Sequence, residues 1–317
     1  MSAAPSPSPA SPLDPHRPLA GVRILSLALN LPGPATLMRC RAMGADCLKF
    51  EPPGGDPMAQ YSQTAYADLH QGIQVQRADL KTAEGQAAVH AELARTDVLL
   101  TSFRPSALAK LGLGWEALQA AHPHLSQVAI VGAAGALAEI PGHDLTYQAE
   151  HGLVSGLHLP PTLYADMGGA LMASEAVLQA VVAARRGERH VAAAASKADP
   201  TSQPNAPSGR YLEVALADAA AFLALPRAWG LTAPAAILGG QHAGYQVFAC
   251  QDGRVAVAAL EPHFSRRLLA AAGLPEDGDA LAPSTREALA NFFAPHTRHA
   301  LDELAQARDI PLHTLAD

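Results

Sequence analysis

Two short stretches of the chain carry residues suited to acid–base chemistry. The stretch IPGHDLTYQAEHGLV at 140–154 places His143 behind a Pro-Gly turn, and TLYADMGGALM at 162–172 places Asp166 before two glycines. Histidine is the usual proton carrier because its pKa lies near neutrality. An aspartate starts near a pKa of ~3.9 and becomes an acid at neutral pH only where burial raises that value. The pair could therefore move protons, or both residues could simply cap helices, as an aspartate at a helix start commonly does.

The glycines after Asp166 bear on both possibilities. Gly168 and Gly169 stand at the expected start of a long helix, and glycine lets a substrate approach the backbone closely. Free N–H groups there could receive the oxygen of an enolate. The same helix end favours the ionised carboxylate of Asp166, whereas burial opposes it, and the sequence leaves that balance open.

Alternating apolar patterns predict the elements that must position these residues. Apolar runs at 21–29, 97–101 and 126–132 are typical of buried strands, and stretches with helical spacing, such as 83–95, separate them. Strands that alternate with helices predict an α/β domain with a parallel sheet. Two β runs that meet at Asp252-Gly253 predict a hairpin, and Ser284 with Glu287 predicts a capping box in a helical C-terminal region.

These patterns predict a Rossmann-like large domain and a smaller α+β domain. The predicted divisions are a disordered tail at 1–17, the large domain at 18–187, a flexible insertion at 188–210, a linker strand and helix at 211–236, and the small domain at 237–317. The first βαβ unit lacks a dinucleotide fingerprint, because its turn offers Gly33 alone between two prolines that have no N–H to donate. We therefore do not expect NAD to bind.

Composition and charge argue against several other classes of function. The net charge of −7 and the lack of any Lys/Arg block argue against a nucleic-acid partner. The longest apolar stretch, at 167–187, is interrupted by Glu175 and predicts a buried helix rather than a membrane span. The chain starts without an apolar signal region, and its three cysteines form no CxxC pattern. We expect a cytoplasmic protein without disulfides and without a metal site.

Eight segments, taken in order, resemble the class III CoA-transferases, the family that also contains α-methylacyl-CoA racemase. They are PLAGVRILSLA, PGPATLMRCRAMGADCLKFEPPGGDP, ADLKTAEG, DVLLTSFRPSALAKLGLGWEAL, PGHDLTY, ADMGGALMA, YLEVALADAA and DGRVAVAALEPHF. The resemblance runs from about Pro18 to Asp317. It implies an interlocked homodimer that acts on acyl-CoA thioesters, with coenzyme A as part of the substrate and no permanently bound cofactor.

Two chemistries occur in this family, and both use the aspartate that matches Asp166. In transferases the carboxylate attacks the thioester and forms covalent intermediates. In racemases a His/Asp pair moves the proton next to the thioester carbonyl, and a glutamate orients the imidazole. The resemblance implies that His143 is the histidine of this pair and that Glu261 is the glutamate that orients it. The histidine is the mark of the racemase branch.

The resemblance also implies positions that bind CoA, whose phosphates need cations and whose other parts need small or apolar surfaces. The matching positions are Ala78, Asp79, Leu80, Lys81, Ser102, Phe103, Arg104, Lys110, Gly142, Asp144 and Tyr147. A charge such as Lys81 is also explained simply as surface charge.

We expect a racemase or epimerase of 2-methylacyl-CoA thioesters, an isomerase of lipid metabolism in which His143 and Asp166 transfer the α-proton. Two alternatives stay open. The chain could be a CoA-transferase that moves CoA between carboxylic acids through covalent Asp166, or a CoA-binding relative without catalysis. Retention of His143, Asp166 and Glu261 together favours catalysis, because a scaffold would have little physical need for all three.

Overall fold

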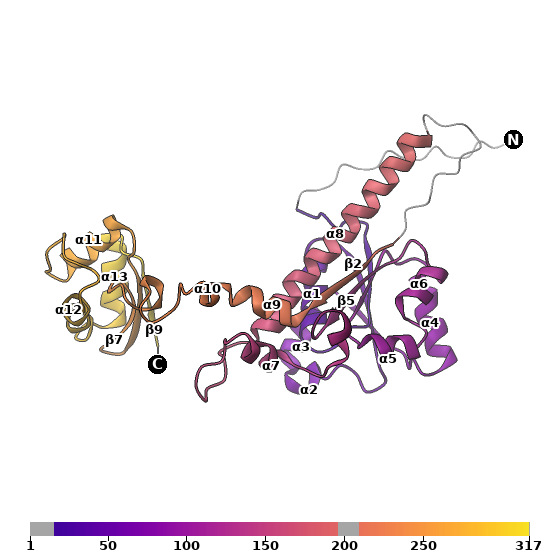
Figure 1. Cartoon of the computed structure of the whole chain (residues 1–317), viewed down its shortest axis with the longest axis horizontal. Coiled ribbons are helices and arrows are strands. Elements are labelled where there is room, and N and C mark those ends of the chain that lie inside the picture. The colour runs from indigo at the N-terminus through magenta and orange to yellow at the C-terminus, as the bar shows by residue number, and fades with distance from the viewer. Residues whose placement is uncertain (1–15, 196–208, 317) are drawn as a thin grey trace. The chain divides into compact units, whose positions relative to one another are not determined.

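The chain folds as two compact units that divide between Leu223 and Ala224 (Figure 1). The computed structural model describes residues 16–195 and 209–316, and of residues 188–195 it describes the backbone. The predicted tail at 1–17 lies almost wholly outside the described residues. Most of the predicted insertion at 188–210 also lies outside them, although its first part continues a helix.

The first unit is built on a six-stranded sheet in which every pairing is parallel. Its strands are β1 (Arg23–Ser26), β2 (Asp46–Glu51), β3 (Gln74–Arg77), β4 (Val98–Thr101), β5 (Ser126–Val131) and β6 (Tyr211–Ala215). Their order, β3-β2-β1-β4-β5-β6, is the doubly wound Rossmann order. The order reverses between β1 and β4, and ligands of such sheets bind beyond the carboxyl ends of the strands at this point. The α/β fold predicted from the sequence is confirmed.

Helices cover both faces of this sheet (Figure 1). They are α1 (Pro32–Ala42), α2 (Met58–Tyr61), α3 (Gln63–Leu69), α4 (Ala83–Leu93), α5 (Pro105–Lys110), α6 (Trp115–Ala121), η1 (Gly135–Glu139), α7 (Asp144–Glu150), α8 (Tyr164–Ala195) and α9 (Leu216–Leu223). One apolar core joins the sheet to α1 and α8, and includes Leu37 and Val177. A second, on the other face, includes Leu93 and Leu118. Strands buried on both faces are rich in apolar residues, and the apolar runs at 98–100 in β4 and 128–131 in β5 made these strands predictable from the sequence.

Gly33 serves packing at the first βα turn. A Cβ atom at this position would lie 2.3 Å from the Cβ of Ala28 and 3.1 Å from its carbonyl carbon. Helix α1 can therefore approach the end of β1 only because residue 33 lacks a side chain. This is the helix–strand contact that a Rossmann glycine also allows, and it requires no phosphate.

The long helix α8 begins earlier than the sequence suggested. It starts at Tyr164, so that Asp166 lies in the first turn and Gly168 and Gly169 lie inside the helix. A Cβ at Gly169 would lie 2.3 Å from Leu216, and a Cβ at Gly168 would lie 3.0 Å from Leu223. The expectation that these glycines expose backbone to a substrate is wrong, since both are buried and bring α8 close to α9.

The stretch Tyr164–Gly187 of α8 is long and apolar enough to cross a membrane by length and composition. Half of its most apolar window is buried inside the protein, where it packs against α1, α9, β5 and β6. This burial is what a core helix requires, and a core helix passes the same test of length and composition.

The second unit is a three-stranded antiparallel sheet with helices packed on it. Its elements are α10 (Leu225–Ala228), η2 (Ile237–Gly239), β7 (Tyr245–Cys250), β8 (Gly253–Ala258), α11 (Pro262–Ala271), α12 (Pro283–Phe293), α13 (Arg298–Arg308) and β9 (Leu312–Leu315). Phe248, Val255, Phe293 and Leu301 lie in its core. The hairpin predicted at Asp252-Gly253 is confirmed, and β9 is a strand where the sequence indicated only helices.

The capping box predicted at Ser284 and Glu287 is wrong. Helix α12 begins at Pro283, so the capping position falls on Ala282 and Ser284 lies inside the helix. Proline has a fixed φ and no N–H, which suits the first helical position. The Thr285 hydroxyl instead donates to the carbonyl oxygen of Asp279, at 2.7 Å.

We expect Gly33→Ala to lower the free energy of unfolding by about 1–3 kcal/mol, because the new methyl group meets a rigid neighbour rather than a movable side chain. Urea denaturation measures this change. Gly54→Ala is the matched control, since a Cβ there meets nothing within 4 Å, and it should change stability by less than about 1 kcal/mol. Equal stabilities of the two variants would contradict this account of the turn.

Candidate active site

A cavity of about 240 Å³ lies where the carboxyl ends of β1, β4, β5 and β6 meet, at the reversal of strand order. It is lined by Leu29, Asn30, Pro32, Ser102, Phe103, Arg104, Ile130, Val131, Gly132, Ala138, Ile140, Pro141, Gly142, His143, Tyr147, Asp166 and Leu216. The lining combines apolar side chains with several polar and charged ones, which could fix the orientation of a small molecule.

The cavity brings together seven of the fourteen residues predicted for the site. These are Ser102, Phe103, Arg104, Gly142, His143, Tyr147 and Asp166. Six others from the first unit, Ala78, Asp79, Leu80, Lys81, Lys110 and Asp144, do not line it. Glu261 belongs to the second unit, where it is the exposed capping residue of α11. Its predicted partnership with His143 stays a prediction.

Asp144 caps helix α8. Its buried carboxylate accepts the backbone N–H of Asp166 through Oδ1 at 3.0 Å, and its Oδ2 accepts the side-chain amide of Gln148. The amide of Gln148 also donates to the carbonyl of Thr162, just before the helix, at 3.2 Å. Because Asp144 supplies the cap, the carboxyl group of Asp166 is left to face the cavity. Capping had been considered from the sequence for Asp166, as the alternative to its catalytic role, and it is Asp144 that provides the cap. The predicted contact of Asp144 with CoA stays a prediction.

The surroundings of Asp166 make its carboxyl group a weak acid. Burial, and then the nearby charge of Asp144, raise the pKa of Asp166 from 3.8 to about 7. Of the two opposing effects considered from the sequence, burial therefore prevails over the helix end. A carboxyl group in this range populates both of its protonation states at neutral pH, which is the condition for general acid–base catalysis.

His143 stands at the start of α7, on the rim of the same cavity. Its backbone N–H donates to the Thr146 hydroxyl at 3.1 Å, and that hydroxyl donates back to the His143 carbonyl at 2.7 Å. The residue is exposed, so its imidazole is accessible to a ligand in the cavity. The adjacent Asp144 thus ties the start of α7 to the start of α8, and places His143 and Asp166 at one cavity.

Tyr147 occupies the space that two glycines leave open. A Cβ at Gly132 would lie 2.1 Å from the Tyr147 hydroxyl oxygen, and a Cβ at Gly142 would lie 2.4 Å from it. Burial, and then the charge of Asp166, raise the pKa of Tyr147, so the phenol stays protonated. Gly142 therefore contributes to the cavity by making room for this ring.

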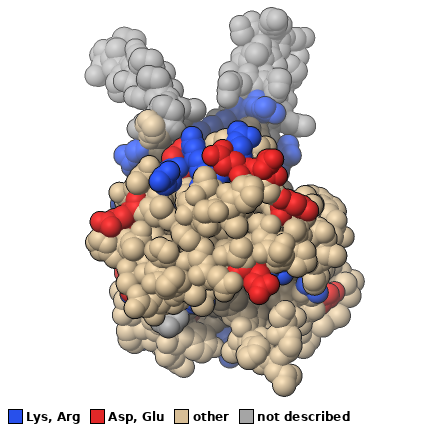
Figure 2. Space-filling view, turned by 90° about the vertical axis from the view of Figure 1, so that its left-hand side faces the viewer, with Lys and Arg blue, Asp and Glu red and all other residues tan. Residues whose placement is uncertain are grey.

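The predicted cations of the CoA site are exposed, and an acid lies near two of them. Arg104 caps α5 and Lys110 ends it. The carboxylate of Glu139 accepts the N–H and hydroxyl of Ser106 at 2.8 and 2.7 Å. These hydrogen bonds lower the pKa of Glu139, and the charges of Arg104 and Lys110 lower it further. On the face drawn in Figure 2, basic and acidic side chains likewise lie side by side.

The segment 78–81 follows β3 at the edge of the sheet. The N–H of Ala78 donates to the carbonyl of Glu51 at 2.9 Å, and Ala78 and Leu80 pack against the second core together with Phe103. The N–H of Lys81 donates to Asp79 at 3.0 Å, and its exposed side chain extends from this turn. The segment therefore packs on the same core as Phe103 but does not line the cavity.

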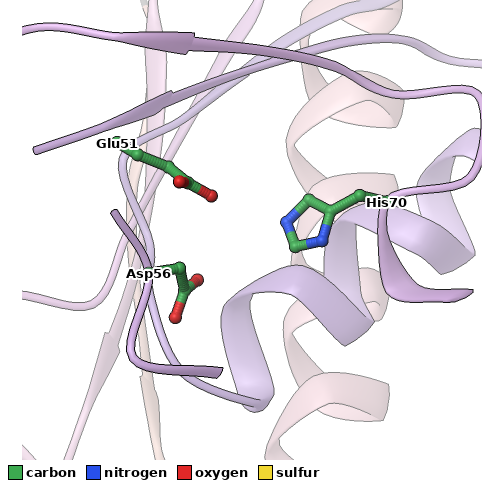
Figure 3. Close-up of side chains that lie close together, drawn as sticks. All are labelled: Glu51, Asp56 and His70. Atoms are coloured by element: carbon green, nitrogen blue, oxygen red, sulfur yellow. The ribbon is translucent and has the colours of Figure 1, made fainter. Parts of the chain in front are cut away.

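A buried ionic cluster beneath the cavity was not foreseen from the sequence. Figure 3 shows Glu51, Asp56 and His70 pointing toward a common centre from β2, the loop after it and the end of α3. Three such groups within 4.8 Å of one another have the spacing of a metal site. Lys49 already fills the centre: its Nζ lies 2.5 Å from Asp56, 3.1 Å from Glu51 and 2.9 Å from Nε2 of His70. We therefore infer an internal ammonium group here and no metal.

The cluster is completely satisfied by its neighbours. Lysine has three protons to donate and finds three acceptors. His70 accepts through Nε2, so its Nδ1 carries the proton and donates to the carbonyl of Tyr66 at 2.6 Å. Burial, with the charge of Lys49 also contributing, lowers the pKa of His70, which keeps this ring neutral. The Tyr66 hydroxyl donates to Glu51 at 2.8 Å.

Comparison with known proteins assigns the chain to a protein family. It belongs to CoA-transferase family III, whose sequence model matches residues 19–317. The family predicted from the eight segments is thereby confirmed, and its named members are enzymes.

The relatives include both chemistries of the family. The chain is 28% identical to α-methylacyl-CoA racemase of Homo sapiens over 82% of this chain and 66% of the racemase. It is 34% identical to succinyl-CoA–D-citramalate CoA-transferase of Chloroflexus aurantiacus over 55% of this chain and 47% of the transferase. The chain thus spans about half to two thirds of these relatives. A hypothetical protein (Rv3272) from Mycobacterium tuberculosis has the same fold, with a TM-score of 0.75 at 24% identity, covering 94% of this chain and 84% of that one.

We expect Lys49→Met to lower the free energy of unfolding by about 3–5 kcal/mol at pH 7, because it leaves two buried carboxylates without their cation. Chemical denaturation measures the loss. Lys81→Met removes an exposed lysine instead and should change stability by no more than about 0.5 kcal/mol. A loss below about 1 kcal/mol for Lys49→Met would mean that the ammonium group does not hold the cluster together.

We expect Asp166→Asn to stabilise the fold increasingly as pH rises. The folded-state pKa of Asp166 is raised from 3.8 to about 7, so the folded wild type binds more protons than the unfolded chain between these values. Its stability therefore falls with rising pH across this window. The variant escapes this loss, by up to about 4 kcal/mol above pH 7, and should match the wild type near pH 4. Denaturation at several pH values measures the difference; a difference independent of pH would refute the shifted carboxyl group.

Proposed function

We propose that the protein is a racemase or epimerase of 2-methylacyl-CoA thioesters, and that His143 and Asp166 exchange the α-proton of the substrate. The observation that carries this proposal is a half-buried carboxyl group, with its pKa raised to about 7, at the same cavity as an accessible imidazole. The human and mouse racemases also align over 82% and 88% of the chain, more than the 55% of the citramalate CoA-transferase.

The chemistry needs two groups that each give and take a proton. One group removes the proton from the α-carbon, and the electron pair of that C–H bond moves onto the thioester oxygen as an enolate. The other group, protonated beforehand, returns a proton to the opposite face of the carbon. At neutral pH a carboxyl group with a pKa of about 7 fills either role, and so does a histidine.

A CoA-transferase is the second candidate, and the 34% identity to the citramalate CoA-transferase favours it. In that reaction the ionised carboxylate of Asp166 attacks the thioester carbon and CoA leaves as the thiolate. The raised pKa of Asp166 works against it, because it reduces the ionised, nucleophilic fraction at neutral pH. Proton transfer uses both forms and is therefore the better match to this carboxyl group.

The remaining roles are proposed on the same basis. Arg104 and Lys110 would meet the phosphates of CoA, and Lys81 would extend this charge from the neighbouring edge. Glu261 would orient the imidazole of His143. A homodimer is proposed as the working form, supported by exposed apolar side chains on α8 and α9: Leu171 and Phe222 are 50% and 67% exposed.

Deuterium incorporation tests the proposal. The protein is incubated in D₂O with each configuration of a 2-methylacyl-CoA, across straight, bile-acid-like and aryl side chains, and mass is followed with time. We expect the wild type to incorporate one deuterium at the α-carbon from either configuration and to produce the opposite one. Asp166→Asn and His143→Ala should each retain exchange with one configuration only, because each keeps the base for a single face.

His151→Ala is the matched control, since His151 ends the same helix α7 but does not line the cavity. It should exchange protons like the wild type. A hydroxylamine-sensitive acyl adduct on Asp166 without any exchange would establish the transferase instead. Binding of CoA that survives both Asp166→Asn and His143→Ala, with no turnover of any thioester by the wild type, would remove both enzymes in favour of a binding role.

A further inference from the structure

Asn30 lines the cavity that holds His143 and Asp166, although it was not among the residues predicted for the site. It follows the first strand and has a left-handed backbone, with φ of 63°. Asparagine is one of the few residues other than glycine that adopt this conformation at small cost. The residue is partly exposed, and its side-chain amide makes no hydrogen bond to any residue the structure describes. The amide is thus available to a ligand.

Two contacts fix the backbone of this loop. The N–H of Asn30 donates to Oδ1 of Asp56 at 3.0 Å, and the N–H of Leu29 donates to the Ser102 hydroxyl at 3.0 Å. Asp56 is buried and is held through its other oxygen by the ammonium group of Lys49. The ionic cluster therefore holds one wall of the cavity, and Asn30 is the side chain that this wall presents.

The backbone N–H groups of Asp166 and of the residues that follow it already have acceptors. The N–H of Asp166 is taken by Asp144, and that of Met167 donates to the carbonyl of Leu163 at 3.0 Å. Gly168 and Gly169 lie inside α8. A side-chain donor elsewhere in the cavity lining that has no acceptor of its own is therefore suited to negative charge that develops on a thioester oxygen.

We propose that Asn30 is that donor: its amide N–H₂ group hydrogen-bonds the thioester oxygen of the acyl-CoA, and the Lys49–Asp56 pair holds it in position. The inference rests on the proposed acyl-CoA substrate, but not on which reaction follows. Removal of the α-proton makes this oxygen an enolate, and attack by Asp166 makes it a tetrahedral oxyanion. Either way the oxygen gains charge in the transition state, where one such donor contributes most.

The substitution Asn30→Gly distinguishes the role of the side-chain amide from the role of the left-handed backbone. Glycine keeps the left-handed conformation at no steric cost and removes only the side chain. We expect kcat for the reaction that the wild type performs to fall by about 100-fold or more. The melting temperature and the affinity for a non-reacting CoA thioester, measured by calorimetry, should change little. Asn30→Asp keeps the shape but places an anion beside the oxygen, and should be at least as slow as Asn30→Gly.

Three results would be decisive. A large loss of kcat in Asn30→Gly with unchanged stability and binding supports the donor. A kcat within about threefold of the wild type overturns the donor role and leaves the proposed enzyme intact, since the residue would then serve the backbone alone. A wild type that neither exchanges nor transfers any acyl-CoA overturns the proposed function and this inference together, which is distinguishable from the second result.

Discussion

The hydrogen bond between the carboxylate of Asp144 and the backbone N–H of Asp166 is the contact on which the site depends. A helix start needs acceptors for its free N–H groups, and an aspartate at position 166 could have served its own helix in this way. Because an acid 22 residues earlier does so, the second carboxyl group is free to enter the cavity. The two acids then lie close enough that the charge of Asp144 adds to burial in raising the pKa of Asp166. One contact thus caps the helix, joins α7 to α8 and raises the pKa of the carboxyl group.

Another part of the cavity wall, at Asn30, is held in place by a buried cation. Lys49 is completely buried and has three acceptors. One of them, the carboxylate of Asp56, also accepts the backbone N–H of Asn30 and so fixes the position of that backbone. Buried ion pairs are weak sources of net stability because their desolvation is costly. Their value here is geometric, since they fix a left-handed loop next to the first strand of the sheet. One part of the cavity lining is therefore positioned by a helix cap, and another part by an internal cation.

More of the fold than of the site could be predicted from the sequence. The parallel strands are buried on both faces, so β4 and β5 contain apolar runs, at 98–100 and 128–131, that local patterns detect. Strand β9 has four residues and lies at a sheet edge, too short for a periodic signal. The residues His143 and Asp166 were found through ordered family motifs. The contact of Asp144 and the centre around Lys49 were missed, because both join residues that come together only in the folded chain. The capping box at Ser284 failed because the neighbouring Pro283 takes the first helical position.

The most direct test of the central claim is the titration of Asp166 itself. The ¹³C resonances of labelled aspartate carboxyl groups are followed against pH in the folded protein, and the signal of residue 166 is assigned by its loss in Asp166→Asn. We expect a midpoint of about 7. A midpoint near the ordinary aspartate value of ~3.9 would contradict it, because the carboxyl group would then be solvated and permanently ionised at neutral pH.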